Sequence, residues 1–163
     1  MTEQYSTSPW SSGLIVMTIV TLIITIGAII LLCYSFMAHS YFFSYRVTFG
    51  VASVVLVVAM LISLALMPKG ISKTSDKLMV HLLVKDIEIP IRDIEKISSY
   101  PYKEKTIRVF GIGGLFGYVG LFENESIGKF DSYVTDFKKS YVIKRKNKRP
   151  IVVTVANPNV LDL

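Results

Sequence analysis

The chain has 163 residues, of which 52% are hydrophobic and 18% are charged, and its formal net charge is +6 at neutral pH. Its only cysteine, Cys33, lies in an apolar run near the N-terminus. Disulfides and thiol catalysis are therefore excluded from the rest of the chain.

Two long apolar runs, residues 14–37 and 47–67, contain no charged residue. As helices they would be roughly 36 and 31 Å long, which is enough to cross the hydrocarbon core of a bilayer. Because only residues 38–46 separate them, we predict an antiparallel transmembrane hairpin with both chain termini on one side. Residues 1–13 form an N-terminal tail with Glu3 and no Lys or Arg, which argues against a cleaved signal peptide.

Flanking charge predicts the orientation of this hairpin. Lys69, Lys73 and Lys77 follow the second run, whereas the loop between the runs offers Arg46 alone. The positive-inside rule therefore predicts a multi-pass protein of a bacterial inner membrane with cytoplasmic N- and C-termini.

Small and hydroxylated residues recur at spacings of three and four along both runs. Such residues let helix backbones approach closely, so we predict a helix–helix seam. Its candidates are Thr18, Thr21 and Thr25 in the first run and Ala52, Ala59 and Ser63 in the second. Neither run has an ionisable residue, which argues against a transport pathway.

Residues 68–163 form a region of mixed charge, suited in length to one small domain. Short stretches rich in Val, Ile and Tyr, separated by turn residues, predict strands. These are residues 71–73, 78–83, 86–91, 94–100, 130–134, 140–144 and 150–155. Without an interleaved helix, they favour a β-sandwich or β-barrel.

Residues 109–122 break this pattern with fourteen uncharged positions in which glycines alternate with bulky side chains. A dinucleotide-binding glycine motif fails because Phe116 stands where its last glycine would be. Two interpretations remain open, a buried core element and a segment in contact with the membrane or a partner. The candidate residues are Phe110, Gly113, Gly114, Phe116, Gly117, Tyr118 and Gly120.

The glycine-aromatic block 110–120, together with residues 128–136 and 89–97, resembles the pleckstrin-homology (PH)-like domains of small bacterial membrane proteins. The resemblance covers about residues 69–163. It implies a membrane-anchored α+β protein with a seven-stranded, partly open β-barrel or sandwich and a C-terminal helix over one end. Here residues 156–163 leave room for only a short helix, about two turns starting at Asn157 or Asn159. We therefore expect the anchor, a partner or the bilayer to help close the barrel mouth.

The excess positive charge comes from one stretch without acidic residues. It consists of Lys138, Lys139, Lys144, Arg145, Lys146, Lys148 and Arg149. On a tethered domain these residues could contact anionic lipid headgroups, at roughly 1 kcal/mol for each basic residue. The alternative is a solvated hairpin that protects a sheet edge. No nucleic-acid-binding module accompanies the charge, so no nucleic-acid partner is expected.

The sequence assembles no recognisable catalytic or metal site. His39 and His81 have no acid, thiol or second histidine at ligand spacing, and the scattered carboxylates are expected to be solvated. We therefore predict no enzyme activity, no metal and no cofactor.

Together these features predict a non-enzymatic accessory or scaffold protein of the membrane. Its PH-like domain would bind a protein partner, which could be another membrane protein or a second copy, or the lipids of an anionic membrane surface. Two alternatives remain: a protective or regulatory factor, such as one conferring immunity to a peptide toxin, and an uncharacterised enzyme.

Overall fold

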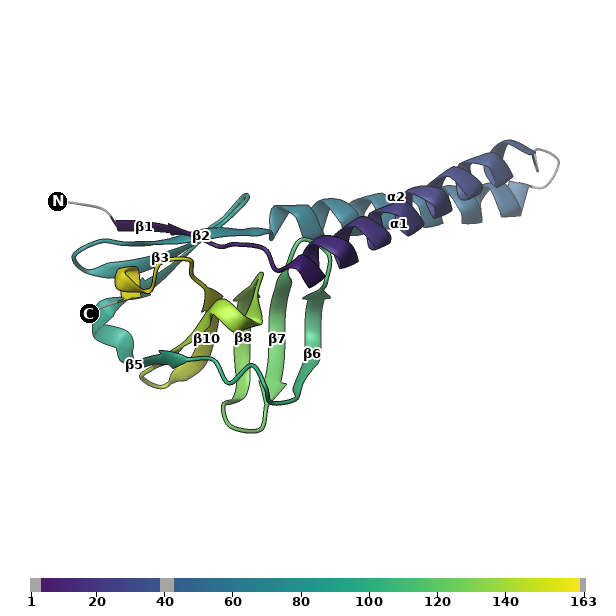
Figure 1. Ribbon diagram of the computed structural model, residues 1–163. Coiled ribbons are helices and arrows are strands. Elements are labelled where there is room, and N and C mark those ends of the chain that lie inside the picture. Colours follow the sequence, from purple (N-terminus) through teal and green to yellow (C-terminus); the bar gives the residue numbers. More distant parts are fainter. Residues whose placement is uncertain (1–3, 39–42, 162–163) are drawn as a thin grey trace.

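A computed structural model describes residues 4–38 and 43–161 of the chain. The two predicted helices are confirmed as α1 (Ser12–Ala38) and α2 (Phe43–Ala65). They pack side by side as a hairpin that projects from one end of a β-rich region (Figure 1). The interpretation of His39 concerns a position outside the described residues.

Both helices are long and apolar enough to cross a membrane. Only 11% and 6% of their most apolar stretches are buried within the protein, whereas the core helix of a soluble protein would be mostly buried. Their outward faces carry large apolar side chains, including Ile23, Ile24 and Leu31 on α1 and Val54 on α2. Exposing such a surface to water is unfavourable, whereas contact with lipid chains is not, which indicates a membrane protein.

The N-terminal tail contributes a strand that the sequence did not predict. Strand β1 (Gln4–Thr7) pairs antiparallel with β2 (Pro68–Lys73), so that Tyr5 lies opposite Ser72. The hydroxyl of Ser11 accepts a hydrogen bond from the Leu14 amide at 3.1 Å, the usual arrangement of a helix N-cap, and α1 starts there. The start of α1 and the end of α2 therefore both lie next to the β-rich region.

The strands form two sheets. A four-stranded sheet has the order β1-β2-β3-β4, with β3 at Lys77–Leu82 and β4 at Asp86–Pro90. A six-stranded sheet has the order β5-β9-β10-β8-β7-β6, in which only the β8–β10 pair is parallel. Its strands are β5 (Ile94–Ser99), β6 (Thr106–Gly113), β7 (Tyr118–Asn124), β8 (Gly128–Val134), β9 (Ser140–Arg145) and β10 (Lys148–Thr154).

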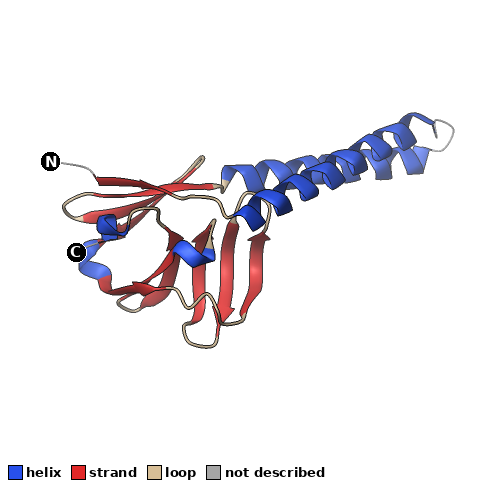
Figure 2. Cartoon of the chain, in the orientation of Figure 1, coloured by secondary structure: helices blue, strands red, loops and turns tan. Residues whose placement is uncertain are grey.

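All seven predicted strands are present, as β2 to β5 and β8 to β10. The expected seven-stranded, partly open barrel or sandwich is confirmed only in part, because the described residues form two open sheets of four and six strands and no strand pair joins them into a barrel. In place of a two-turn C-terminal helix, the described residues, which end at position 161, form one 3₁₀ turn, η3 (Pro158–Leu161). Val160 and Leu161 of this turn are buried, so the short turn still covers one end of the core (Figure 2).

The main core lies between the two sheets. Ile71, Leu78 and Val80 of the four-stranded sheet meet Ile143 and Ile151 of the six-stranded sheet, and all are nearly inaccessible to solvent. A second, aromatic cluster covers the other face of the six-stranded sheet. It comprises Tyr100, Phe122, Phe130, Val134, Val142 and Val152, with Phe137 packed against it. Alternation of apolar side chains along each strand supplies both faces.

Candidate functional site

The β-rich region is fixed to the base of both helices. The Thr18 hydroxyl of α1 donates to the Gly114 carbonyl at 3.2 Å and accepts from the Phe116 amide at 3.3 Å. Both partners lie in the turn between β6 and β7. On the other helix, the Val84 amide in the β3–β4 turn donates to the Ala65 carbonyl at 3.2 Å, which satisfies one of the free carbonyls at the end of α2.

Residues 109–122 are therefore not a break in the strand pattern, as the sequence suggested, but the edge hairpin β6–β7. Val119 and Phe122 are buried, whereas Phe110 is 78% exposed. Gly113 ends β6, Tyr118 starts β7, and Gly114, Phe116 and Gly117 form the connecting turn. The Trp10 ring lies 6.4 Å from the Phe116 ring, so the turn also contacts the chain before α1. The segment thus combines a core face, an exposed edge and a joint with the anchor.

Glycine is required at the centre of this hairpin. Gly111 and Gly120 lie directly opposite each other, with φ angles of +118° and +133°. A side chain at either position would collide with the opposite backbone, at the Val119 carbonyl for Gly111 and the Phe110 carbonyl for Gly120. The two glycines therefore bring the strands together in a backbone conformation that side chains rarely permit.

Beside this hairpin lies an apolar cavity of about 540 Å³ between α2 and the two sheets. Its wall on the α2 side consists of Ala59, Ile62 and Ser63, together with Leu66 just after the end of the helix. The opposite wall comes from β3, β4, β6, β7 and β8, including Phe110, Gly120 and Tyr133. Burial, and to a smaller extent the Asp131 carboxylate, raise the pKa of Tyr133, so its hydroxyl stays protonated at physiological pH.

The six residues of the predicted helix–helix seam lie in three different environments. Thr21, Thr25 and Ala52 are partly buried. Thr18 is almost fully buried but bonds to the hairpin turn, and Ala59 is exposed toward the apolar cavity. Ser63 is buried and donates to the carbonyl of Ala59.

The seven basic residues predicted to contact the membrane together lie at two separate places in the structure. Lys138 and Lys139 lie in the 3₁₀ turn η2 (Phe137–Lys139) before β9, whereas the others lie around the β9–β10 turn at the opposite end of that strand. The η2 end is near the anchor, because Thr135 bonds to Pro9 and Ser11 just before α1. The β9–β10 turn adjoins the start of β5, away from the helices (Figure 1). Contact of all seven with one membrane surface remains a prediction.

Three of the basic residues around the β9–β10 turn form ion pairs with acidic side chains. Arg145 and Arg149 pair with Asp131 at 3.5 and 3.8 Å, and Lys148 pairs with Asp93 at 3.0 Å. The hydrogen bond from Lys148 holds the pKa of Asp93 below its usual range. Lys144 and Lys146 are exposed and remain accessible to a negatively charged surface.

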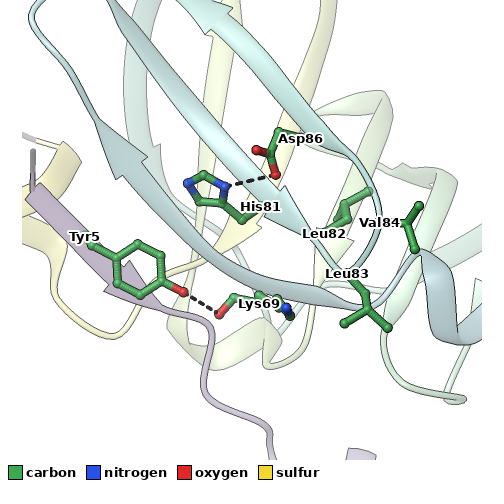
Figure 3. Close-up of a pocket in the computed structure, with 7 residues that line it drawn as sticks. All are labelled: Tyr5, Lys69, His81, Leu82, Leu83, Val84 and Asp86. Carbon is green, nitrogen blue, oxygen red and sulfur yellow. Dashed lines mark hydrogen bonds and ion pairs between the residues drawn. The ribbon is translucent and has the colours of Figure 1, made fainter.

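The outer face of the four-stranded sheet carries a hydrogen-bonded chain that the sequence missed. His81 Nε2 lies 2.8 Å from Ser72 Oγ, and His81 Nδ1 lies 2.9 Å from Asp86 Oδ1. The prediction that His81 has no neighbouring acid is therefore wrong, because the β3–β4 pairing places Asp86 directly opposite it. Tyr5 of β1 lies 5.9 Å from the imidazole, ring to ring, beside a pocket lined also by Lys69 (Figure 3).

The order serine, histidine, aspartate matches that of a hydrolytic triad, but the accessibility does not. Ser72 is 0% exposed beneath this outer face, so a substrate carbonyl has no path to its hydroxyl. The arrangement suits a structural bond that ties β2 to β3. No group of three His, Cys, Asp or Glu side chains that could hold a metal is found in residues 4–38 and 43–161. The expected lack of a cofactor stays a prediction.

Replacing His81 with alanine should lower the free energy of unfolding by about 1–3 kcal/mol, because it leaves the buried Ser72 hydroxyl without its partner. Thermal and denaturant unfolding of the full-length protein in mild detergent would measure this. Lys77→Ala is the control, since it removes only the exposed ion pair with Glu88 on the same sheet. Equal small effects of the two variants would contradict a structural role for His81.

Comparison with known proteins agrees with the fold. The family model described as Bacterial PH domain matches residues 69–161. No curated protein and no solved structure matches the chain significantly. The match begins just after α2 and ends at η3, so it covers the β-rich region except for β1, which the tail supplies. The chain therefore belongs to the Bacterial PH domain family and carries, before that domain, two helices that could span a membrane.

Proposed function

We propose that this chain is a non-enzymatic accessory protein of a bacterial inner membrane that binds a second membrane protein through the edge strand β6. The observation that carries the proposal is the composition of this edge. Ile107 and Val109 are 55% and 46% exposed, and Phe110 is exposed further still. Soluble proteins usually protect such an edge with charges, prolines or a covering segment, because it can pair with another chain.

The position of β6 supports a partner that is itself in the membrane. β6 is the last strand of the six-stranded sheet, so one side of its backbone has no strand neighbour among the described residues. It leads directly into the turn held by Thr18 of α1. A partner segment paired with β6 would therefore run beside the anchor. Strand addition of this kind gains affinity from main-chain hydrogen bonds and specificity from alternate side chains.

The fixed joint supports a scaffold role. Hydrogen bonds between the domain and both α1 and α2 hold it at a defined position relative to the helices, so a partner bound at β6 would be held in one orientation. Lys69, Lys73 and Lys77, which follow α2, support a cytoplasmic location for this domain.

The test is affinity purification of the tagged full-length protein from its native membrane in mild detergent. The double variant Ile107→Lys and Val109→Lys should reduce recovery of a stoichiometric partner at least tenfold, because two charges on the edge oppose strand addition. Tyr102→Lys is the matched control, since Tyr102 is also an exposed large side chain but lies outside β6. Unchanged partner recovery with the double variant would contradict the proposal.

A further inference from the structure

We infer that the apolar cavity beside α2 binds one acyl chain of an anionic membrane phospholipid, whose phosphate is bound by Lys85. The cavity has a volume of about 540 Å³, within the usual range for small-molecule sites. This inference shares Phe110 of β6 with the edge contact proposed above, but it does not depend on a protein partner.

The first observation is the position of the cavity along the anchor. Ala59, Ile62 and Ser63 form its helical wall and also belong to the Val47–Ala65 segment that is apolar enough to span a membrane. A cavity that opens along the last turns of such a helix meets the bilayer at the level where acyl chains approach the headgroups. A chain can therefore enter it without passing through water.

The second observation is the chemistry of the walls. Ile62 and Leu66 face Leu82, Ile87 and Ile112 across the cavity, and all five side chains are hydrocarbon. The one hydroxyl on the helical wall is that of Ser63. It donates to the Ala59 carbonyl of its own helix, so it needs no hydrogen-bond acceptor on a ligand. Apart from Lys85 and the Tyr133 hydroxyl on the opposite wall, the side chains of the lining are apolar or already hydrogen-bonded, which suits a hydrocarbon chain rather than a polar metabolite.

The third observation is a cation on the cavity lining. Lys85 lines the cavity, is exposed, and forms no ion pair within the part of the chain that the structure describes. It lies in the β3–β4 turn, which is tied to the end of α2 by the hydrogen bond from Val84 to Ala65. This bond places Lys85 beside the end of the span, where lipid phosphates lie. An acyl chain in the cavity and a phosphate on Lys85 are thus compatible in one lipid.

The test is native mass spectrometry of the full-length protein in mild detergent, titrated with phosphatidylglycerol or with phosphatidylcholine of the same chain length. Ala59→Phe should weaken binding of the first phosphatidylglycerol at least fivefold, because the ring would occupy the cavity. Val58→Phe, one residue away and exposed but not on the cavity wall, should leave it unchanged. Lys85→Gln should remove the preference for phosphatidylglycerol over phosphatidylcholine.

Several outcomes would overturn the inference. Equal phosphatidylglycerol affinity in Ala59→Phe and the unchanged protein would show that no chain enters the cavity. A preference for phosphatidylglycerol that survives Lys85→Gln would show that this lysine does not bind the phosphate. As a check that needs no variant, phosphatidylglycerol with a photoreactive acyl chain should label β6 or β7 of the unchanged protein. Labelling confined to α1 and α2 would also overturn it.

Discussion

Alanine at Gly111 is expected to lower the free energy of unfolding by at least about 2 kcal/mol and to separate β6 from β7. The added methyl group must be held at a φ of +118°, and it would meet the Val119 carbonyl of the facing strand. Backbone strain and overpacking each cost about 1–3 kcal/mol. Alanine at Gly120 should behave alike, because its methyl group would meet the Phe110 carbonyl. Denaturant unfolding and hydrogen exchange of the hairpin amides in mild detergent would measure both effects.

Gly128→Ala provides the matched control for these variants. Gly128 also has a positive φ, +75°, but a side chain there would have no neighbour within 4 Å. Gly128→Ala should therefore lower the free energy of unfolding only through backbone strain, by about 1 kcal/mol. If Gly111→Ala were no more damaging than Gly128→Ala, the close approach of the two strands would not matter for stability.

Replacing Thr18 with valine is expected to detach the β6–β7 turn from α1. Valine keeps the shape of threonine but removes the hydroxyl that serves both the Gly114 carbonyl and the Phe116 amide. Thr18 is only 4% exposed, so these groups would lack water as a substitute, at about 1–3 kcal/mol for each. For the two groups together we expect a loss of about 2–6 kcal/mol. Faster hydrogen exchange at the Phe116 amide would locate the loss at the joint.

Thr25→Val serves as the control in the same helix. Thr25 is partly buried two turns farther along α1 and takes no part in the joint with the hairpin turn. It should change neither the unfolding free energy nor the exchange of Phe116 appreciably. Equal behaviour of the two variants would mean that the domain is held to the anchor by other contacts.

Sequence periodicity was sufficient for the parts of the fold whose pattern is local. Apolar runs without charge define α1 and α2, and alternating residues define strands such as β3 and β4. The burial of β3 alternates along all six of its residues, as a strand with one core face requires. These features depend on neighbouring residues in the chain, so no knowledge of the rest of the fold was needed.

Strand β1 could not be predicted in this way. Its four residues, Gln4–Thr7, are largely polar and carry no strand pattern of their own. They form a strand because β2 offers an open edge, and because Ser8 and Ser6 bond to Thr154 and Asn157 near the C-terminus. All these partners are more than sixty residues away along the chain. Tertiary contacts here determine the local structure.

The β6–β7 hairpin and the basic segment escaped prediction for different reasons. Glycines weaken strand patterns in general, so Gly111 and Gly120 concealed a hairpin that depends on them. The basic residues are close in sequence, but β9 is extended and holds Lys139 and Lys146 at opposite ends. For the same reason the sequence could not show that Thr18 leaves the helix seam to bond the hairpin turn.

The pairing of β1 with β2 also constrains how the protein is made. These neighbouring strands lie on either side of the whole helical hairpin in the chain, so the four-stranded sheet is complete only after both helices have been synthesised. If α2 failed to insert, β1 and β2 would emerge on opposite sides of the bilayer and could not meet. The unpaired edge of β2 would then be open to proteolysis or to pairing with other chains. For helices that span a membrane, completion of this sheet would therefore mark a chain in which both helices have been inserted.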